Sequence, residues 1–101
     1  MKKILLLCSA GMSTSLVVRK MRDVAEKKGL EVEIEAMGLE EFHNKLEEYD
    51  VFLLGPQVRY KKDELDGIAR EVGKRVEVIN SMDYAMMKGE EILNFAYSLM
   101  N

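Results

Sequence analysis

The only cysteine of this chain, Cys8, stands between a run of apolar residues and a short loop rich in hydroxyl groups. The run at 4–7 is typical of a buried strand, and helical spacing of apolar residues begins at about Ser13. The N–H groups of such a loop and the positive end of the following helix favour an anion. They therefore favour the thiolate of Cys8, the predicted nucleophile, and would hold a phosphoryl group on its sulfur. The predicted phosphate-binding residues are Ser9, Ala10, Gly11, Met12, Ser13, Thr14 and Ser15.

The residue six positions after the cysteine separates two kinds of phosphate chemistry. A small α/β cysteine phosphatase uses Cys-x5-Arg, in which the arginine stabilises the charge of the transition state. Here that position is Thr14, and the nearest arginine is Arg19. Neutral donors hold a phosphoryl group without strongly promoting attack by water, which suits a covalent phosphoryl carrier. A low-molecular-weight cysteine phosphatase or an arsenate reductase remains the alternative. A redox module is less favoured because the chain has no resolving cysteine.

Composition narrows the class of protein further. The 101 residues, of which 48% are apolar, suit one compact domain over 1–101. A formal net charge of −3 and the lack of a basic stripe with interleaved aromatic residues argue against a nucleic-acid partner. One cysteine rules out an internal disulfide and fits a reducing compartment, so we expect a cytoplasmic protein. With one cysteine and one histidine we expect no metal site, and no cofactor is needed for the chemistry.

The apolar runs are too short for a membrane segment. Only four apolar residues separate the lysines at positions 2 and 3 from Cys8, whereas a signal peptide needs about 7–15. No run approaches the roughly 18–20 apolar residues that span a bilayer. We therefore expect no direct membrane insertion.

Strand and helix patterns alternate along the whole chain. Strands are predicted at 3–8, 31–36, 51–54 and 75–79. Helices are predicted from about Ser13 to Lys28, around 39–46 and around 65–72, with Val72 on the buried face of the third. A last helix is predicted from about Asp83 onward, with Met86 and Met100 on its buried face. This order predicts an α/β fold: a doubly wound, four-stranded parallel sheet with helices on both faces. The two most apolar strands should be central, which gives the order 2-1-3-4, a flavodoxin-like arrangement similar to that of small cysteine phosphatases.

That strand order places a second loop beside Cys8. Ligands of such sheets bind beyond the carboxyl ends of the strands, at the switch point between the first and third strands. Cys8 ends the first strand, and residues 55–60 come directly after the third. Gln57 and Tyr60 are therefore candidate second-loop contacts to a phosphoryl group, whereas Arg59 is interpreted as solvated.

Three other features receive a simple interpretation. The single histidine, His43, is expected at the surface on the short second helix, away from Cys8. Asp83 is expected in the first turn of a helix, where an acidic residue interacts well with the dipole, rather than as a general acid. Met12, Val58 and Tyr60 are expected to form an exposed apolar rim around Cys8 for a partner protein.

The run Cys-Ser-Ala-Gly-Met-Ser-Thr-Ser at 8–15, with Leu-Gly-Pro-Gln about 45 residues later at 54–57, resembles one known family. It is similar to the lactose/cellobiose-type (cellobiose/chitobiose) IIB component of the bacterial PEP-dependent sugar phosphotransferase system. The resemblance covers essentially the whole chain, and neither motif departs from the family pattern. It implies that Cys8 accepts phosphate from a phosphohistidine on the IIA partner and passes it to a disaccharide held by the IIC membrane transporter.

The resemblance leaves the sugar open. Cellobiose, chitobiose and lactose-like β-glucosides are all compatible, because the transporter selects the sugar. We expect a monomer that meets its IIA and IIC partners in turn.

Overall fold

The centre of the fold is a parallel sheet of four strands in the order β2-β1-β3-β4. The computed structural model describes residues 1–9 and 12–100. The strands are β1 (Lys2–Cys8), β2 (Val32–Gly38), β3 (Val51–Leu54) and β4 (Val76–Val78). In the register of the central strands, Ile4 lies opposite Ile34 on one side and Val51 on the other. The predicted fold class, the strand order and the edge position of the second strand are confirmed.

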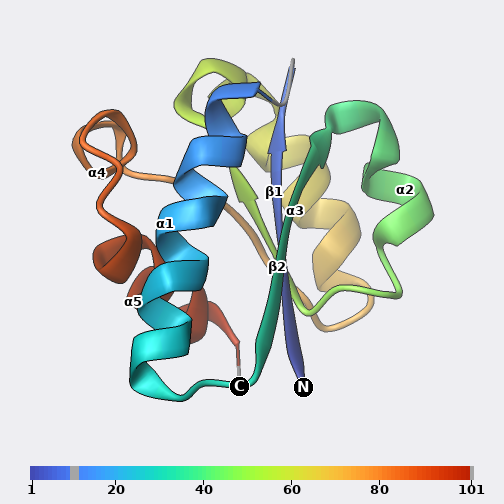
Figure 1. Ribbon diagram of the computed structural model, residues 1–101. Coiled ribbons are helices and arrows are strands. Elements are labelled where there is room, and N and C mark those ends of the chain that lie inside the picture. Colours follow the sequence, from blue (N-terminus) through green and yellow to red (C-terminus); the bar gives the residue numbers. More distant parts are fainter. Residues whose placement is uncertain (10–11, 101) are drawn as a thin grey trace.

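Helices cover both faces of this sheet (Figure 1). One face carries α1 (Met12–Lys28), α4 (Ser81–Ala85) and α5 (Gly89–Leu99). The other carries α2 (Phe42–Lys45) and α3 (Lys62–Arg70), each preceded by a short 3-10 helix, η1 (Leu39–Glu41) and η2 (Pro56–Lys61). This division results from the right-handed crossovers that parallel strands require.

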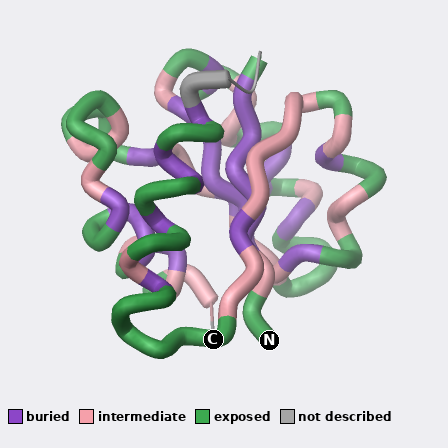
Figure 2. Tube along the Cα trace, in the orientation of Figure 1, coloured by how far each residue is buried: buried purple, intermediate pink, exposed green. Residues whose placement is uncertain are grey.

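The two faces bury separate apolar clusters. Ile4 and Leu6 pack on the side of α1 and α5, whereas Leu5 and Leu7 pack on the side of α2 and α3. Successive side chains of a strand point to opposite faces, so a strand covered on both sides must be apolar at every position. Figure 2 shows this arrangement: the buried residues lie along the strands and the inner faces of the helices. The continuous apolar run before Cys8 is thereby explained.

The C-terminal helix differs from its prediction because it is two helices rather than one. A turn separates α4 from α5, and Met87 in that turn has a φ of 50°. Met86 is 60% exposed instead of buried, and Met100 lies beyond the end of α5. A close approach fits this break: a Cβ on Gly89 would lie 2.6 Å from the backbone oxygen of Lys20. The chain turns so that the start of α5 can pack directly on the backbone of α1.

The third helix begins and ends earlier than predicted. It ends at Arg70, and Val72, expected on its buried face, is 48% exposed. Gly73, with a φ of 76°, completes the turn towards β4. A left-handed residue at this point suits glycine, which has no Cβ to clash.

The buried carboxylate of Asp66 on α3 binds groups at the start of β4. Asp66 accepts hydrogen bonds from the backbone N–H of Val76 at 2.8 Å, from Nε of Arg70 at 2.8 Å and from Nε of Arg75 at 3.1 Å. Burial alone would raise the pKa of this carboxyl group. The bonds from Val76, Arg70 and Arg75 outweigh burial and lower the pKa to about 2.

Candidate active site

Cys8 is the last residue of β1 and is 1% exposed. Its neighbour Leu7 accepts a hydrogen bond at 2.9 Å from the N–H of Gly55, the first residue after β3. The bond extends the pairing of β1 with β3 by one residue and brings the two loops together at the carboxyl edge of the sheet. This is the juxtaposition that the strand order predicts.

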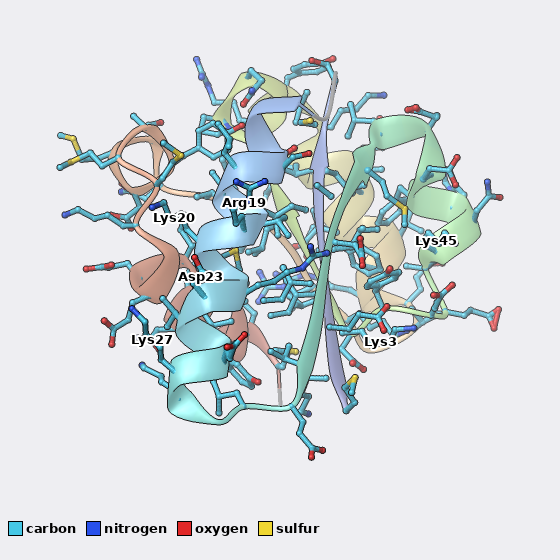
Figure 3. All side chains as sticks on the ribbon, viewed as in Figure 1. Lys3, Arg19, Lys20, Asp23, Lys27 and Lys45 are labelled. Carbon is cyan, nitrogen blue, oxygen red and sulfur yellow. The ribbon has the colours of Figure 1, made fainter. Side chains whose placement is uncertain are left out.

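Thr14 provides a polar partner for Cys8. Its side chain is fully buried near the start of α1, and Oγ1 lies 3.1 Å from the sulfur of Cys8. A thiolate can only accept, so in that state the hydroxyl donates to sulfur. Arg19 lies exposed on α1 (Figure 3). The position that holds arginine in a phosphatase loop is thus filled by a neutral hydroxyl.

In the loop after β3, the side chain of Gln57 folds back over Gly55. A Cβ on Gly55 would lie 2.7 Å from Oε1 of Gln57 and 3.7 Å from the Cβ of Cys8. Gly55 has an ordinary extended backbone, and a Cβ here would meet only the end of the exposed Gln57 side chain at close range. Oε1 of Gln57 therefore lies where the methyl group of an alanine at position 55 would be. Nε2 of the same side chain donates a hydrogen bond to the hydroxyl of Tyr84 at 3.4 Å.

The remaining predicted loop residues differ in their placement. Ser9 and Ser15 are exposed. Ala10, Gly11 and the side chains of Met12 and Ser13 lie outside the described residues, so their roles stay predictions.

The second loop departs from the predicted rim at one position. Tyr60 is 73% exposed, as expected, but Val58 is 1% exposed and packs in the cluster under α2 and α3. The 3-10 turns of η2 explain this, because they direct Val58 inward while its neighbours stay outside. Arg59 is exposed and donates to the carbonyl of Pro56, within its own loop.

His43 and Asp83 agree with their simple interpretations. His43 is exposed on α2, edge-on to Phe42. Asp83 lies in the first turn of α4, where its N–H donates to the capping side chain of Asn80.

Sequence reasoning missed the contact of Tyr84 with the second loop. Tyr84 lies 27 positions after Gln57, on α4, and reaches the loop after β3 from the side. Its aromatic ring falls in a stretch predicted as one long amphipathic helix, where an aromatic residue indicates core packing. The position of Tyr84 depends on the break between α4 and α5, which the sequence pattern did not predict.

Within residues 1–9 and 12–100, no group of three or more His, Cys, Asp or Glu side chains could hold a metal ion. No helix in this part of the chain has the length and apolar character needed to cross a bilayer.

Comparison with known proteins identifies the family. The profile of "PTS system, Lactose/Cellobiose specific IIB subunit" matches residues 3–95. The chain belongs to this family. It is a phosphoryl-carrier subunit of a sugar phosphotransferase system, and it works with the IIA and IIC components of that system.

Individual relatives agree on the component but differ in the sugar. The chain is 45% identical to the oligo-beta-mannoside-specific EIIB component of Bacillus subtilis (strain 168), covering 99% of this chain and 97% of that protein. It is 43% identical to the galactose-specific EIIB component of Lactococcus lactis subsp. cremoris (strain MG1363), with the same two shares. The solution structure of the cellobiose-specific IIB component of Borrelia burgdorferi superposes with a TM-score of 0.83 at 38% identity, covering 99% of this chain and 92% of that one.

Proposed function

We propose that Cys8 is the residue that carries the phosphoryl group in this IIB component. The observation that carries the proposal is the buried Cys8 sulfur at the carboxyl end of β1, 3.1 Å from the Thr14 hydroxyl at the start of α1. A helix start offers N–H donors and a positive dipole end to an anion. Residues 9–15 hold the phosphoryl group with these N–H groups and with side-chain hydroxyls.

The first transfer loads the cysteine. A lone pair of the Cys8 thiolate forms the S–P bond while the P–N bond of a phosphohistidine on IIA breaks, and the imidazole keeps the electron pair of that bond. The Thr14 hydroxyl stabilises the charge on sulfur before the attack. This chain's own contribution is orientation and neutral hydrogen-bond donation, since the phosphorus arrives already activated.

The second transfer unloads the cysteine. A sugar hydroxyl oxygen forms the new O–P bond, the S–P bond breaks, and its electron pair returns to sulfur while the hydroxyl proton is released. Thr14 again stabilises the thiolate, now as the leaving group. A site that favours the free thiolate therefore assists both transfers.

The sugar is a disaccharide of the cellobiose, chitobiose or lactose class, held by the IIC transporter. Support comes from the family and from relatives named for oligo-beta-mannosides and cellobiose, while a relative named for galactose keeps the range wide. The protein acts as a cytoplasmic monomer, because one reactive edge of one chain must meet two different partners in turn.

The surface around Cys8 is the docking face for IIA. Tyr60 is an exposed aromatic ring on the second loop, which adjoins the cysteine. Adding IIA to labelled protein should shift the NMR signals of residues 56–61 and leave those of β2 and His43 unchanged. Shifts centred on α2 would place the docking face elsewhere.

Phosphoryl transfer to Cys8 is tested by mass. Incubation with phosphorylated IIA should add one phosphate to the wild-type protein, and the Cys8→Ser variant should take up no stable label. His43→Gln is the control, because His43 is exposed on α2, outside the two loops that adjoin the sulfur. Normal labelling of the serine variant at another residue would disprove the assignment to Cys8.

A further inference from the structure

The strand β2 lies at one edge of the sheet. Within residues 1–9 and 12–100 it pairs only with β1, so the other side of its backbone is an open edge. An open edge presents N–H and C=O groups that can pair with an extended strand of another chain. At seven residues β2 is the longer edge strand, since β4 has three. It therefore offers the better template for pairing between copies of this chain.

The hydrogen bonds of β1 show which peptide groups of β2 face outward. The carbonyl of Lys3 accepts from the N–H of Asp50, on the side of β3. Successive residues of a strand direct their peptide groups to opposite sides, so Ile4 directs its own towards β2. In a parallel ladder, the residue opposite one that points inward points away from it. Ile34 lies opposite Ile4, so the carbonyl of Ile34 faces the open edge.

Arg22 of α1 covers this outward-facing carbonyl. Its Nε donates to the carbonyl oxygen of Ile34 at 2.9 Å, and its Nη2 donates to the same oxygen. Nη2 also forms an ion pair with Oε2 of Glu35 at 3.1 Å. Ile34 packs on the side of α1, so the side chain of Glu35 leaves the strand on the opposite face. The side chain of Arg22 thus reaches across the open edge of β2.

The other edge strand is covered by the same kind of contact. The carbonyl of Arg75 accepts from the N–H of Phe52 in β3, so the next residue, Val76, directs its peptide groups outward. The N–H of Val76 donates to Oδ1 of Asp66 at 2.8 Å, and Asp66 comes from α3. At both edges, a charged side chain from a covering helix binds a backbone group that an incoming strand would need.

We propose that Arg22 blocks the open edge of β2 against a strand from a second copy of this chain. A strand that pairs there must bind the carbonyl of Ile34, the third of the seven residues of β2. It would first have to displace a charged donor, and charge-assisted hydrogen bonds are stronger than those between neutral groups. The inference rests on the proposed function in one respect, that the carrier acts as a monomer.

The test removes the contact across the edge without changing the net charge. Arg22→Ala combined with Glu35→Gln removes both charged groups. Arg19→Ala combined with Glu26→Gln is the matched control, because it makes the same changes at exposed positions of α1. We expect sedimentation equilibrium to give a dimerisation constant at least about tenfold higher for the Arg22 variant, the size of one charge-assisted hydrogen bond. The control should stay within about twofold of the wild type.

NMR locates the new contact. In the Arg22 variant, the amide signals of residues 32–38 should shift as the protein concentration rises, while those of β3 stay unchanged. Association with shifts centred elsewhere would overturn the inference. Association with loss of the native far-UV circular dichroism would also overturn it, because Arg22 would then hold α1 in place rather than protect the edge.

The wild type separates this inference from the proposed function. If the wild type itself sedimented as a dimer, the monomeric carrier of the proposed function would fail. If the wild type and the Arg22 variant were both monomers, only the blocking role of Arg22 would fail. The phosphoryl transfer through Cys8 is tested by its own labelling experiment.

Discussion

Two polar regions of this molecule are built from opposite kinds of groups. At the junction of α3 and β4, the buried carboxylate of Asp66 is held by the guanidinium groups of Arg70 and Arg75. At the carboxyl edge of β1, the side chains described around Cys8 are a hydroxyl and a carboxamide, those of Thr14 and Gln57. Arg70 and Arg75 hold an anion that stays in place, whereas the phosphoryl group proposed to pass through Cys8 would meet neutral side chains.

The difference shows what a carrier requires. A guanidinium fork holds a carboxylate or phosphate strongly and stabilises the transition state for attack by water. Neutral donors retain the group well enough for transfer, but they lower the barrier to hydrolysis less. In the proposed function, Thr14 supplies a neutral donor at the position where a phosphatase has arginine.

Removing the permanent anion should give the largest effect. Asp66→Ala leaves the N–H of Val76 without its acceptor and removes one ion pair each from Arg70 and Arg75, so the free energy of unfolding should fall by about 3–5 kcal/mol. Urea unfolding measures this loss. Asp63→Ala, on the exposed side of the same helix, should cost less than about 1 kcal/mol. A similar loss for both variants would show that Asp66 has no special role.

The neutral site should make a poor phosphatase. Hydrolysis of p-nitrophenyl phosphate should stay near background, because the lack of a charged donor costs on the order of a hundredfold in rate. Rapid hydrolysis of this ester by the wild type, abolished in Cys8→Ser, would contradict the prediction of a poor phosphatase.

The charged region should respond to acid in a defined window. Because the pKa of Asp66 is about 2 in the folded protein and 3.8 ordinarily, the unfolded chain takes up the proton first as pH falls. The carboxylate therefore contributes about 2 kcal/mol of stability above pH 4, and this contribution is lost as pH falls towards 2. Urea midpoints at pH 5, 3 and 2 should fall more steeply for the wild type than for Asp66→Ala. Parallel curves would contradict this prediction.

The smallest effect is expected at the cysteine's own partner. Thr14→Val keeps the buried volume and removes the hydroxyl next to sulfur, so the rate of phosphoryl uptake from IIA should fall about tenfold. Thr14→Ser keeps the hydroxyl and should retain most of the rate. Equal rates for the valine and serine variants would mean that the hydroxyl contributes nothing.

The sequence predicted the parts of the fold that depend on apolar periodicity. The run before Cys8 and the run at 51–54 identified the central strands, and the strand order then placed Gly55 and Gln57 beside the cysteine. Topology sufficed here, because adjacent parallel strands end at one edge.

The wrong predictions of side-chain burial share one cause. Val58 lies inside, Val72 lies outside and Met86 lies on the surface because a local turn, rather than a helical period, sets the direction of each side chain. Tyr84 was missed for the same reason, since its contact with Gln57 depends on where α4 stops. Short turns are fixed by tertiary packing, which periodicity does not record.

The contact of Gly89 with Lys20 has a mechanical consequence for the site. A Cβ on Gly89 would lie only 2.6 Å from the carbonyl oxygen of Lys20, so the start of α5 packs directly against the backbone of α1. Lys20 lies less than two turns after Thr14, on the helix whose first turn faces the cysteine. A single methyl group at position 89 would therefore force α5 and α1 apart, less than two turns from the threonine that contacts Cys8.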